Sequence, residues 1–165
     1  MLAQAKAKQD KLHTITLQRL AVRMDAGLKP KYILGSDEFG MHLFPRSAWK
    51  WEKVGAQEVK SALKEDKRQY TGDIVMNLPG DVIAVEQIWA GKSSDCLPHA
   101  DVRSRFPHFL FTFSENHWAN LQTKLELANR IWKWVVDEHI KDAAEEGREI
   151  DRKEAEATAE CVWLL

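Results

Sequence analysis

Hydrophobic spacing near the start of the chain predicts a single amphipathic helix. Over residues 12–24, apolar side chains recur at intervals of three, four and seven, which places them on one helix face. Gly27 and Pro30 follow and are expected to end the helix. Residues 1–9 are mostly Ala, Gln and Lys, so we expect a frayed start there.

The next hydrophobic segments are short, and they predict strands. The apolar run 32–34 leads into Asp37, which predicts a buried strand with a carboxylate at its C-terminal tip. A second short extended piece is expected at 41–44. Residues 69–78 and 82–89 are strand-like and are separated by a Pro-Gly-Asp turn signal. These segments predict an antiparallel meander.

A long helix is the strongest pattern in the second half of the chain. Residues 92–112 read as mostly irregular, with a short apolar piece at 109–111. The helix is predicted over 117–140, with Ser114 or Asn116 as its N-terminal cap. Steps of three and four predict one continuous apolar seam, formed by Trp118, Leu121, Leu125, Ala128, Trp132 and Val135.

The end of the chain combines a charged stretch with an apolar one. Residues 137–160 are dense in charge and predict a solvated helical linker. Residues 161–165 are apolar and predict a buried parallel strand beside the Asp37 strand, reached through a right-handed helical crossover. We expect an N-terminal helical segment (1–30) and an α/β domain (31–165) with a mixed sheet. This order matches the opening half of a ribonuclease H-like fold, which implies a truncated domain.

Composition limits the contribution of overall charge to nucleic-acid binding. The chain has 165 residues, 44% apolar and 30% charged, with a formal net charge of −1. A free-standing DNA-binding domain usually has a basic surplus, because phosphate neutralisation supplies much of its affinity. Any DNA contact must therefore come from a local patch or from a missing segment. The candidates lie in one basic stretch with two tryptophans, for which a solvated loop is the alternative: Lys50, Lys53, Lys67 and Arg68.

The cysteines and the apolar runs indicate a compartment. Cys96 and Cys161 are far apart and form no disulfide framework, which favours a reducing environment. No run approaches the ~18 apolar residues of a membrane span, and the N-terminus has no apolar signal core. We expect a nuclear or cytoplasmic protein that is neither secreted nor inserted in a membrane. A zinc site using Cys96, His99, His108 and His117 is disfavoured, because their spacing matches no common structural zinc motif.

Five short segments in a fixed order carry a resemblance to a known family. They resemble the DDE superfamily endonuclease domain of pogo-like transposases, in the mariner–pogo group. The resemblance covers roughly residues 15–140 and resumes at 161–165. The segments are Ile33 to Gly40, Trp51 to Ala56, Asp66 to Gln69, Gly91 to Pro98 and Ser114 to Trp118.

The resemblance implies a catalytic and metal-binding role for Asp37, with Mg²⁺ or Mn²⁺ as the cofactor and DNA as the substrate. Asp37-Glu38-Phe39-Gly40 matches the first acidic motif of the family, with Phe39 in place of the usual Thr. The family's second aspartate directly follows a strand resembling 162–165, and its third acid lies further on. Two metal ions need several carboxylates. We therefore expect this chain alone to be inactive and to bind no metal stably. Glu115 and Glu126 are open alternatives that the family pattern does not use.

Three hypotheses about function follow. The first is a fragment of a DNA transposase or endonuclease catalytic domain. The second is a domesticated, non-catalytic module that binds DNA or protein, and the third is an active enzyme whose gene is mis-delimited. His117 is expected either to contact DNA or to pack at the helix start. A sheet face left uncovered predicts self-association.

Overall fold

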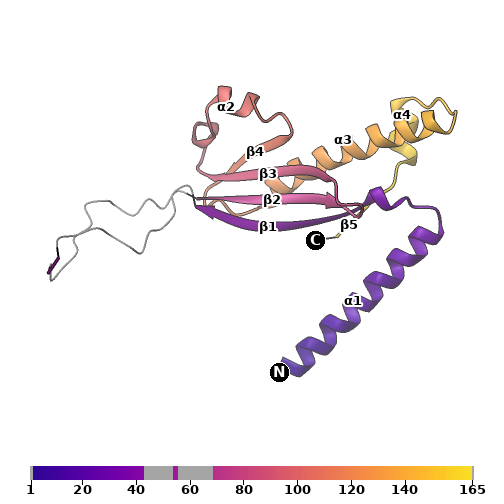
Figure 1. Ribbon diagram of the computed structural model, residues 1–165, viewed down its shortest axis with the longest axis horizontal. Coiled ribbons are helices and arrows are strands. Elements are labelled where there is room, and N and C mark those ends of the chain that lie inside the picture. Colours follow the sequence, from indigo (N-terminus) through magenta and orange to yellow (C-terminus); the bar gives the residue numbers. More distant parts are fainter. Residues whose placement is uncertain (1, 43–53, 56–68, 165) are drawn as a thin grey trace. The chain divides into compact units, whose positions relative to one another are not determined.

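The computed structural model describes residues 2–42, 54–55 and 69–164, and it has an α/β architecture. Five strands form one mixed sheet in the order β4-β3-β2-β1-β5 (Figure 1). The strands are β1 (Ile33–His42), β2 (Gln69–Asn77), β3 (Val82–Ala90), β4 (Phe109–Ser114) and β5 (Val162–Leu164). The helices are α1 (Leu2–Asp25), α2 (Ala100–Ser104), α3 (Leu121–Glu145) and α4 (Arg152–Thr158), with the short 3-10 turns η1 (Pro30–Tyr32) and η2 (Ser94–Cys96).

Parallel pairing joins strands that are far apart in the sequence. β5 pairs with β1 in the register Ile33↔Val162 and Gly35↔Leu164, after the chain has passed through α3 and α4. The predicted parallel strand beside the Asp37 strand is therefore confirmed. β4 pairs with β3, also in parallel, with Val85 opposite Phe109. This places the predicted short piece at 109–111 at the opposite edge of the sheet.

A polar turn fixes the register of the β2–β3 hairpin. The Asn77 side chain accepts hydrogen bonds from the backbone N–H groups of Gly80 at 3.0 Å and Asp81 at 2.7 Å. Gly80 has a φ of 102°, a left-handed conformation that glycine adopts without steric cost. The backbone N–H of Asn77 closes the turn by donating to Asp81 at 3.0 Å. The strand boundaries predicted at 69–78 and 82–89 are thus confirmed to within one residue.

The chain divides into two compact units, and every strand except β4 and β5 contributes to both. Unit 1 comprises Met1–Ser36, Val75–Ile83 and Asn129–Leu165. Unit 2 comprises Asp37–Ile74 and Ala84–Ala128. In unit 1 the buried side chains include Leu34, Val75, Ile131 and Val135. In unit 2 they include Ala84, Ile88 and Leu127, together with several polar residues.

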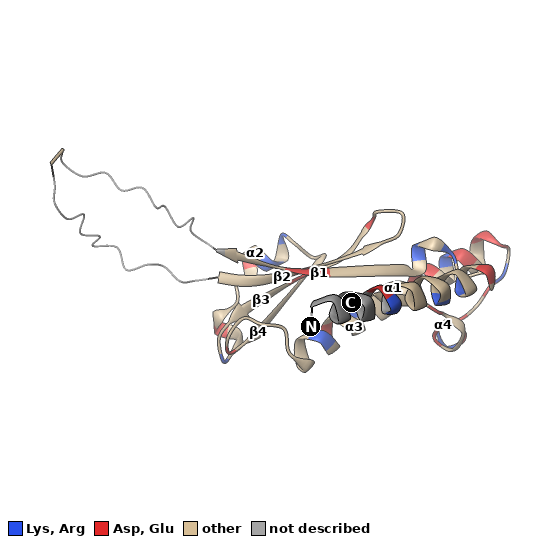
Figure 2. Cartoon of the chain, turned by 90° about the horizontal axis from the view of Figure 1, so that it is seen from below, with Lys and Arg blue, Asp and Glu red and all other residues tan. Residues whose placement is uncertain are grey.

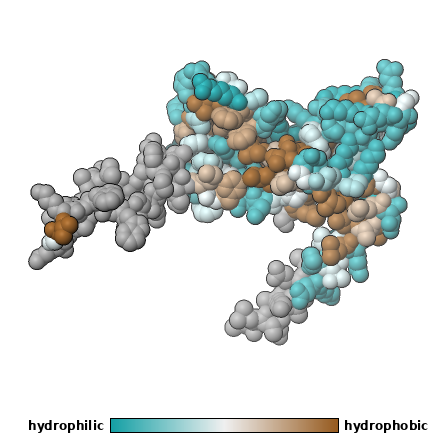
Figure 3. Space-filling view, in the orientation of Figure 1, coloured by the Kyte–Doolittle hydropathy of each residue, from teal (hydrophilic) through white to brown (hydrophobic). Residues whose placement is uncertain are grey.

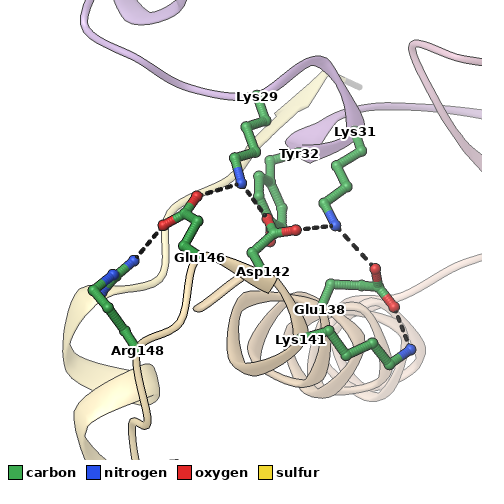
Figure 4. Close-up of polar contacts among 8 residues, drawn as sticks. All are labelled: Lys29, Lys31, Tyr32, Glu138, Lys141, Asp142, Glu146 and Arg148. Carbon is green, nitrogen blue, oxygen red and sulfur yellow. Dashed lines mark hydrogen bonds and ion pairs between the residues drawn. The ribbon is translucent and has the colours of Figure 1, made fainter. Parts of the chain in front are cut away.

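A buried carboxylate ties the start of β1 to α3 within unit 1 (Figure 4). Asp142 is 7% exposed and accepts hydrogen bonds from Lys31 Nζ and the Tyr32 hydroxyl, both at 2.7 Å. Lys29 Nζ lies 3.2 Å from the same carboxylate. Burial alone would raise the pKa of Asp142, but the hydrogen bonds from Lys31 and Tyr32 hold that pKa below its usual value. Asp142 is therefore a charged structural anchor.

The stretch 137–160 differs in part from the predicted solvated linker. α3 continues to Glu145, α4 covers Arg152–Thr158, and both helices carry acidic and basic residues (Figure 2). Some of the acids are not merely solvated, since Asp142 is buried and Glu138 accepts a hydrogen bond from Lys31 at 3.1 Å. The charge pattern alone could not distinguish these acids, because their basic partners lie more than 100 positions earlier.

The N-terminal predictions need two corrections. α1 begins at Leu2, so residues 1–9 are not the expected frayed start, apart from residue 1, which lies outside the described residues. β1 is one continuous strand of ten residues, Ile33–His42, rather than a strand ending at Asp37 and a separate piece at 41–44. The polar residues of β1 stay extended because β2 lies beside them in the sheet.

The predicted seam of α3 was mostly wrong. Leu121 is 78% exposed and Leu125 is 50% exposed, whereas Leu127 and Ile131 are buried. The helix carries apolar residues on two adjacent stripes, so periodicity did not fix which stripe faces the sheet. The cap was also mispredicted: Asn120 Oδ1 accepts from the Thr123 N–H, and Thr123 Oγ1 accepts from the Asn120 N–H, both at 3.0 Å. This reciprocal cap starts the helix at Leu121.

None of the helices in the described part of the chain has the length and apolar content needed to span a bilayer.

Substitution on the two stripes of α3 tests this orientation. We expect Leu127→Ala to lower the free energy of unfolding by about 2–5 kcal/mol, because it leaves a cavity in the core. Leu121→Ala, the matched control on the exposed stripe, should change it by less than about 0.5 kcal/mol. Urea unfolding followed by circular dichroism measures both. A larger loss for Leu121→Ala would show that the opposite stripe faces the core.

Candidate functional site

Asp37 lies in the middle of β1 rather than at its C-terminal tip, and it is exposed to solvent. Successive side chains of a strand point to opposite faces of the sheet. Asp37 therefore shares a face with Phe39, whereas Glu38 points to the other face, where it meets Lys124 of α3. The two neighbouring acids of the Asp37-Glu38 motif thus serve different sides of the sheet.

The face that carries Asp37 is aromatic. The Phe39 ring lies over Gly72 of β2 so closely that a Cβ there would come within 2.4 Å of Phe39 Cζ. Tyr70 lies two residues before Gly72 on β2 and therefore points to the same face. Its ring stacks on Trp89 of β3, with ring centroids 5.1 Å apart. Phe39 is 37% exposed, so part of this face is open to solvent. The predicted self-association through an uncovered sheet face stays a prediction.

The opposite face holds a lysine between two carboxylates. Lys124 Nζ lies 2.7 Å from Asp73 Oδ2 on β2 and 2.6 Å from Glu38 Oε1 on β1. Burial lowers the pKa of Lys124, but hydrogen bonds to Asp73 and Glu38 outweigh it and raise that pKa above its usual value. Asp73 is fully buried; burial raises its pKa, and the Lys124 hydrogen bond opposes that rise. The ammonium group is the counter-charge that makes this burial tolerable.

Glu86 on β3 is a second fully buried acid of the same unit. The Thr112 hydroxyl donates a hydrogen bond to Glu86 Oε1 at 2.8 Å. Burial raises the pKa of Glu86 to about 7, and the Thr112 hydrogen bond opposes that rise. Glu86 Oε2 and Asp73 Oδ1 are buried and have no hydrogen-bond partner among the described residues. Unit 2 therefore contains two buried acids, of which Asp73 is paired with Lys124 and Glu86 is hydrogen-bonded by Thr112.

His117 occupies a strained position at the turn before α3. Its φ of 58° is a left-handed conformation that side chains with a Cβ seldom adopt. Its Nδ1 lies 3.1 Å from the Thr71 hydroxyl, and its Nε2 contacts the Gln69 side-chain amide. Both ring nitrogens are thus used to hold the turn against β2. The proposed DNA contact of His117 stays a prediction, and it would have to displace one of these bonds.

The other candidate residues are not gathered around Asp37. The basic candidates Lys50, Lys53, Lys67 and Arg68 lie outside the described residues. Glu115 is paired with Lys92 at 3.7 Å, and Glu126 accepts a hydrogen bond from Gln122 at 2.8 Å. Within residues 2–42, 54–55 and 69–164, no group of three or more His, Cys, Asp or Glu side chains is arranged to hold a metal ion.

The donor groups near Asp37 do not fit a two-metal centre. Such a centre needs several carboxylates that converge from separate elements onto ions roughly 3.5–4 Å apart. Glu38 points away from Asp37, and Asp73 is buried and bound to Lys124. Asp37 contributes one exposed carboxylate, which accounts for one or two of the oxygen ligands that Mg²⁺ requires.

Sequence reasoning missed Asp73, Glu86 and Lys124. A signal was present, because Asp73 lies between Thr71 and Val75 on the inward positions of β2, and Glu86 lies between inward apolar residues of β3. An acid at an inward strand position predicts either a basic partner or a shifted pKa. The sequence did not show which lysine would reach Asp73, since Lys124 is 51 positions away.

Comparisons with protein-family models, with curated proteins and with solved structures gave no match.

The buried Glu86 predicts a pH-dependent stability. The folded state retains a proton up to a pKa of about 7, whereas the unfolded chain releases it near 4.5. The stabilisation that protonated Glu86 gives the folded state is therefore fully present below pH 4.5. It is lost as the pH rises to 7, which lowers the free energy of unfolding by up to about 3 kcal/mol. Glu86→Gln keeps the neutral form and should remove this part of the pH dependence. Urea unfolding of both proteins between pH 4.5 and 7.5 measures it; parallel pH profiles would contradict the assignment.

Substitution of Lys124 tests the counter-charge directly. We expect Lys124→Met to destabilise the fold by about 3–5 kcal/mol, because it leaves Asp73 buried without a cation. The double variant Lys124→Met/Asp73→Asn should regain most of that loss. Lys133→Met, at an exposed position of the same helix, is the matched control and should be near neutral. Equal destabilisation of the single and double variants would mean that packing of the Lys124 stem, not its charge, matters.

Proposed function

We propose that this chain is part of a DDE-type DNA endonuclease or transposase catalytic domain with a ribonuclease H-like fold. The observation that carries the proposal is the parallel pairing of β5 with the strand that bears Asp37, after a long helical crossover. The β2–β3 hairpin beside β1 supports it as well. A two-metal site needs carboxylates that converge from separate elements, and β5 lies parallel to the strand that carries Asp37.

The position of Asp37 supports the proposal. β5 pairs with Ile33 to Gly35, so Asp37 is the second residue beyond the last paired position of β1. Its carboxylate is exposed, which leaves it open to a substrate. DNA is accordingly the proposed substrate class of the parent domain, and Mg²⁺ or Mn²⁺ its proposed cofactor.

We further propose that this chain by itself does not cleave DNA and binds no divalent metal stably. The supporting observation is the set of donor groups: Asp37 is exposed on one face, while Glu38 and Asp73 are held by Lys124 on the other. No group of three or more His, Cys, Asp or Glu side chains in the described part of the chain is arranged around Asp37.

Plasmid nicking tests this proposal. With supercoiled DNA and Mg²⁺ or Mn²⁺, the chain should give no more nicked product than Asp37→Ala, because one carboxylate cannot hold two ions. Phe113→Ala, at an exposed position of β4, serves as the matched control for folding and purification. Nicking by the unmodified chain that Asp37→Ala abolishes would contradict the proposed inactivity while supporting the nuclease assignment.

A second candidate function is a non-catalytic DNA-binding module. The observation that favours it is the pairing of Lys124 with Glu38 and Asp73, which neutralises both acids without a metal ion. The DNA contact would use the basic stretch that holds Lys50, Lys53, Lys67 and Arg68.

Electrophoretic mobility shift at two salt concentrations tests the DNA-binding function. We expect Lys67→Ala/Arg68→Ala to reduce the salt dependence of the binding constant by a slope of about 2, because each phosphate contact contributes roughly 0.9. The control Lys133→Ala/Lys153→Ala removes the same charge from exposed positions of α3 and α4 and should leave the slope unchanged. Absence of a shift even at low salt would exclude DNA binding by this chain.

A further inference from the structure

Two acidic side chains, Asp73 and Glu86, lie at matching places on neighbouring strands of unit 2. Asp73 is four residues before the end of β2, and Glu86 is four residues after the start of β3. Both occupy inward strand positions and are 0% exposed. The next inward residues of β3, Ala84 and Ile88, are buried and apolar, and Figure 3 shows hydrophobic atoms over the middle of the sheet. The Asp73–Glu86 pair is therefore out of contact with solvent.

Each carboxyl group of the Asp73–Glu86 pair has one oxygen with a donor and one without. Lys124 Nζ donates to Asp73 Oδ2 at 2.7 Å, and the Thr112 hydroxyl donates to Glu86 Oε1 at 2.8 Å. Asp73 Oδ1 and Glu86 Oε2 are buried and have no partner among the described residues. A buried polar atom without a partner costs about 1–3 kcal/mol, so two of them at matching strand positions need a common explanation.

A single proton on Glu86 satisfies both oxygens. Oε2 of a protonated Glu86 is a hydroxyl group that donates, and Oδ1 of an ionised Asp73 accepts. Hydrogen bonds from a hydroxyl to a carboxylate are short, at roughly 2.5–2.7 Å, and stronger than those between neutral groups. With this bond in place, hydrogen bonds connect Lys124, Asp73, Glu86 and Thr112 across β2, β3, β4 and α3.

The charges around the Asp73–Glu86 pair favour one proton rather than none. The other ionisable groups that act on the pair are Asp37 and Glu38 on β1, and Lys124 and Glu126 on α3. Three of these four are acids, and Lys124 already pairs with Glu38 at 2.6 Å. β4 contributes the Thr112 hydroxyl, which carries no charge. A second buried negative charge would therefore have to be balanced by a lysine that two other acids already share.

We propose that Asp73 and Glu86 share one proton, and that this proton keeps residues 121–128 of α3 seated on the sheet of unit 2. Glu86 Oε2 holds the proton and donates it to Asp73 Oδ1. As the pH rises, the proton leaves to solvent, the interior gains one negative charge, and α3 loosens where Lys124 anchors it. The pair is thus a pH-sensitive switch. It depends on neither DNA nor a metal ion, so its failure and the failure of the proposed nuclease ancestry are distinguishable.

Carbon-13 NMR of the side-chain carboxyl groups tests the shared proton on the full chain. The signals of Glu86 and Asp73 should shift together, with one common midpoint near pH 7, because both groups sense the same proton. A water molecule that donated to both oxygens would instead leave Glu86 ionised at pH 6 and the Asp73 signal constant near pH 7. That result would overturn the proposal.

Removal of the acceptor charge provides the matched comparison. Asp73→Asn should weaken proton binding by Glu86 at least about tenfold, because it removes the charge that the proton bridges. Glu126→Gln removes an acid that acts on Glu86 through its charge alone, and it should weaken proton binding by less than about threefold. Equal effects of the two variants would contradict a shared proton. If Asp73→Asn does not fold, the joint titration of the unmodified chain remains decisive.

Hydrogen exchange tests the switch. The amides of residues 125–128 should lose protection about tenfold between pH 6 and 8.5, corrected for intrinsic exchange, because the closed state holds the proton up to a pKa of about 7 and an open state only to about 4.5. Residues 131–136 of the same helix belong to unit 1 and should keep their protection. Glu86→Gln, whose neutral amide donates to Asp73 at every pH, should abolish the loss. Constant protection of residues 125–128 in the unmodified chain, or an equal loss in both segments, would overturn the switch.

Discussion

The parallel pairing of β5 with β1 is the constraint on which the rest of the structure depends. Parallel neighbours cannot be joined by a tight turn, and the chain reaches β5 from β4 through α3 and α4. That requirement brings Leu127, Ile131 and Val135 of α3 into the core and gives the helix its buried stripe. It also places β1 between β2 and β5 in the described sheet, with Asp37 upon it.

Each compact unit contains an ion pair between a lysine and a buried carboxylate. In unit 1, Lys31 reaches Asp142 on α3; in unit 2, Lys124 reaches Asp73 on β2. Ion pairs of this kind add little net stability over apolar contacts, but removing one partner leaves a buried charge and is costly. They also specify which elements meet, since a lysine in the wrong register would leave the acid unpaired. The two pairs thus fix the seating of α3 in each unit.

The position of Asp37 and the surroundings of Asp37 lead to different conclusions about function. Its place on β1, two residues beyond the pairing with β5, supports the proposed descent from a metal-binding acid. Its surroundings are aromatic, and the nearest acids on β1 and β2 are committed to Lys124. The proposed descent from a nuclease domain therefore does not require that this chain binds metal ions today.

The sequence by itself determined the local elements: the β2–β3 hairpin, the existence of the long helix and the final strand followed from turn residues and hydrophobic period. It also singled out Asp37 as a strand acid. The tertiary structure decided the rotation of α3, the continuation of β1 past Asp37, and the partners of Asp73 and Asp142. The physical reason is range. Turns and periodicity act over a few residues, whereas the face that a helix buries and the lysine that neutralises an acid depend on residues 51 to 111 positions away.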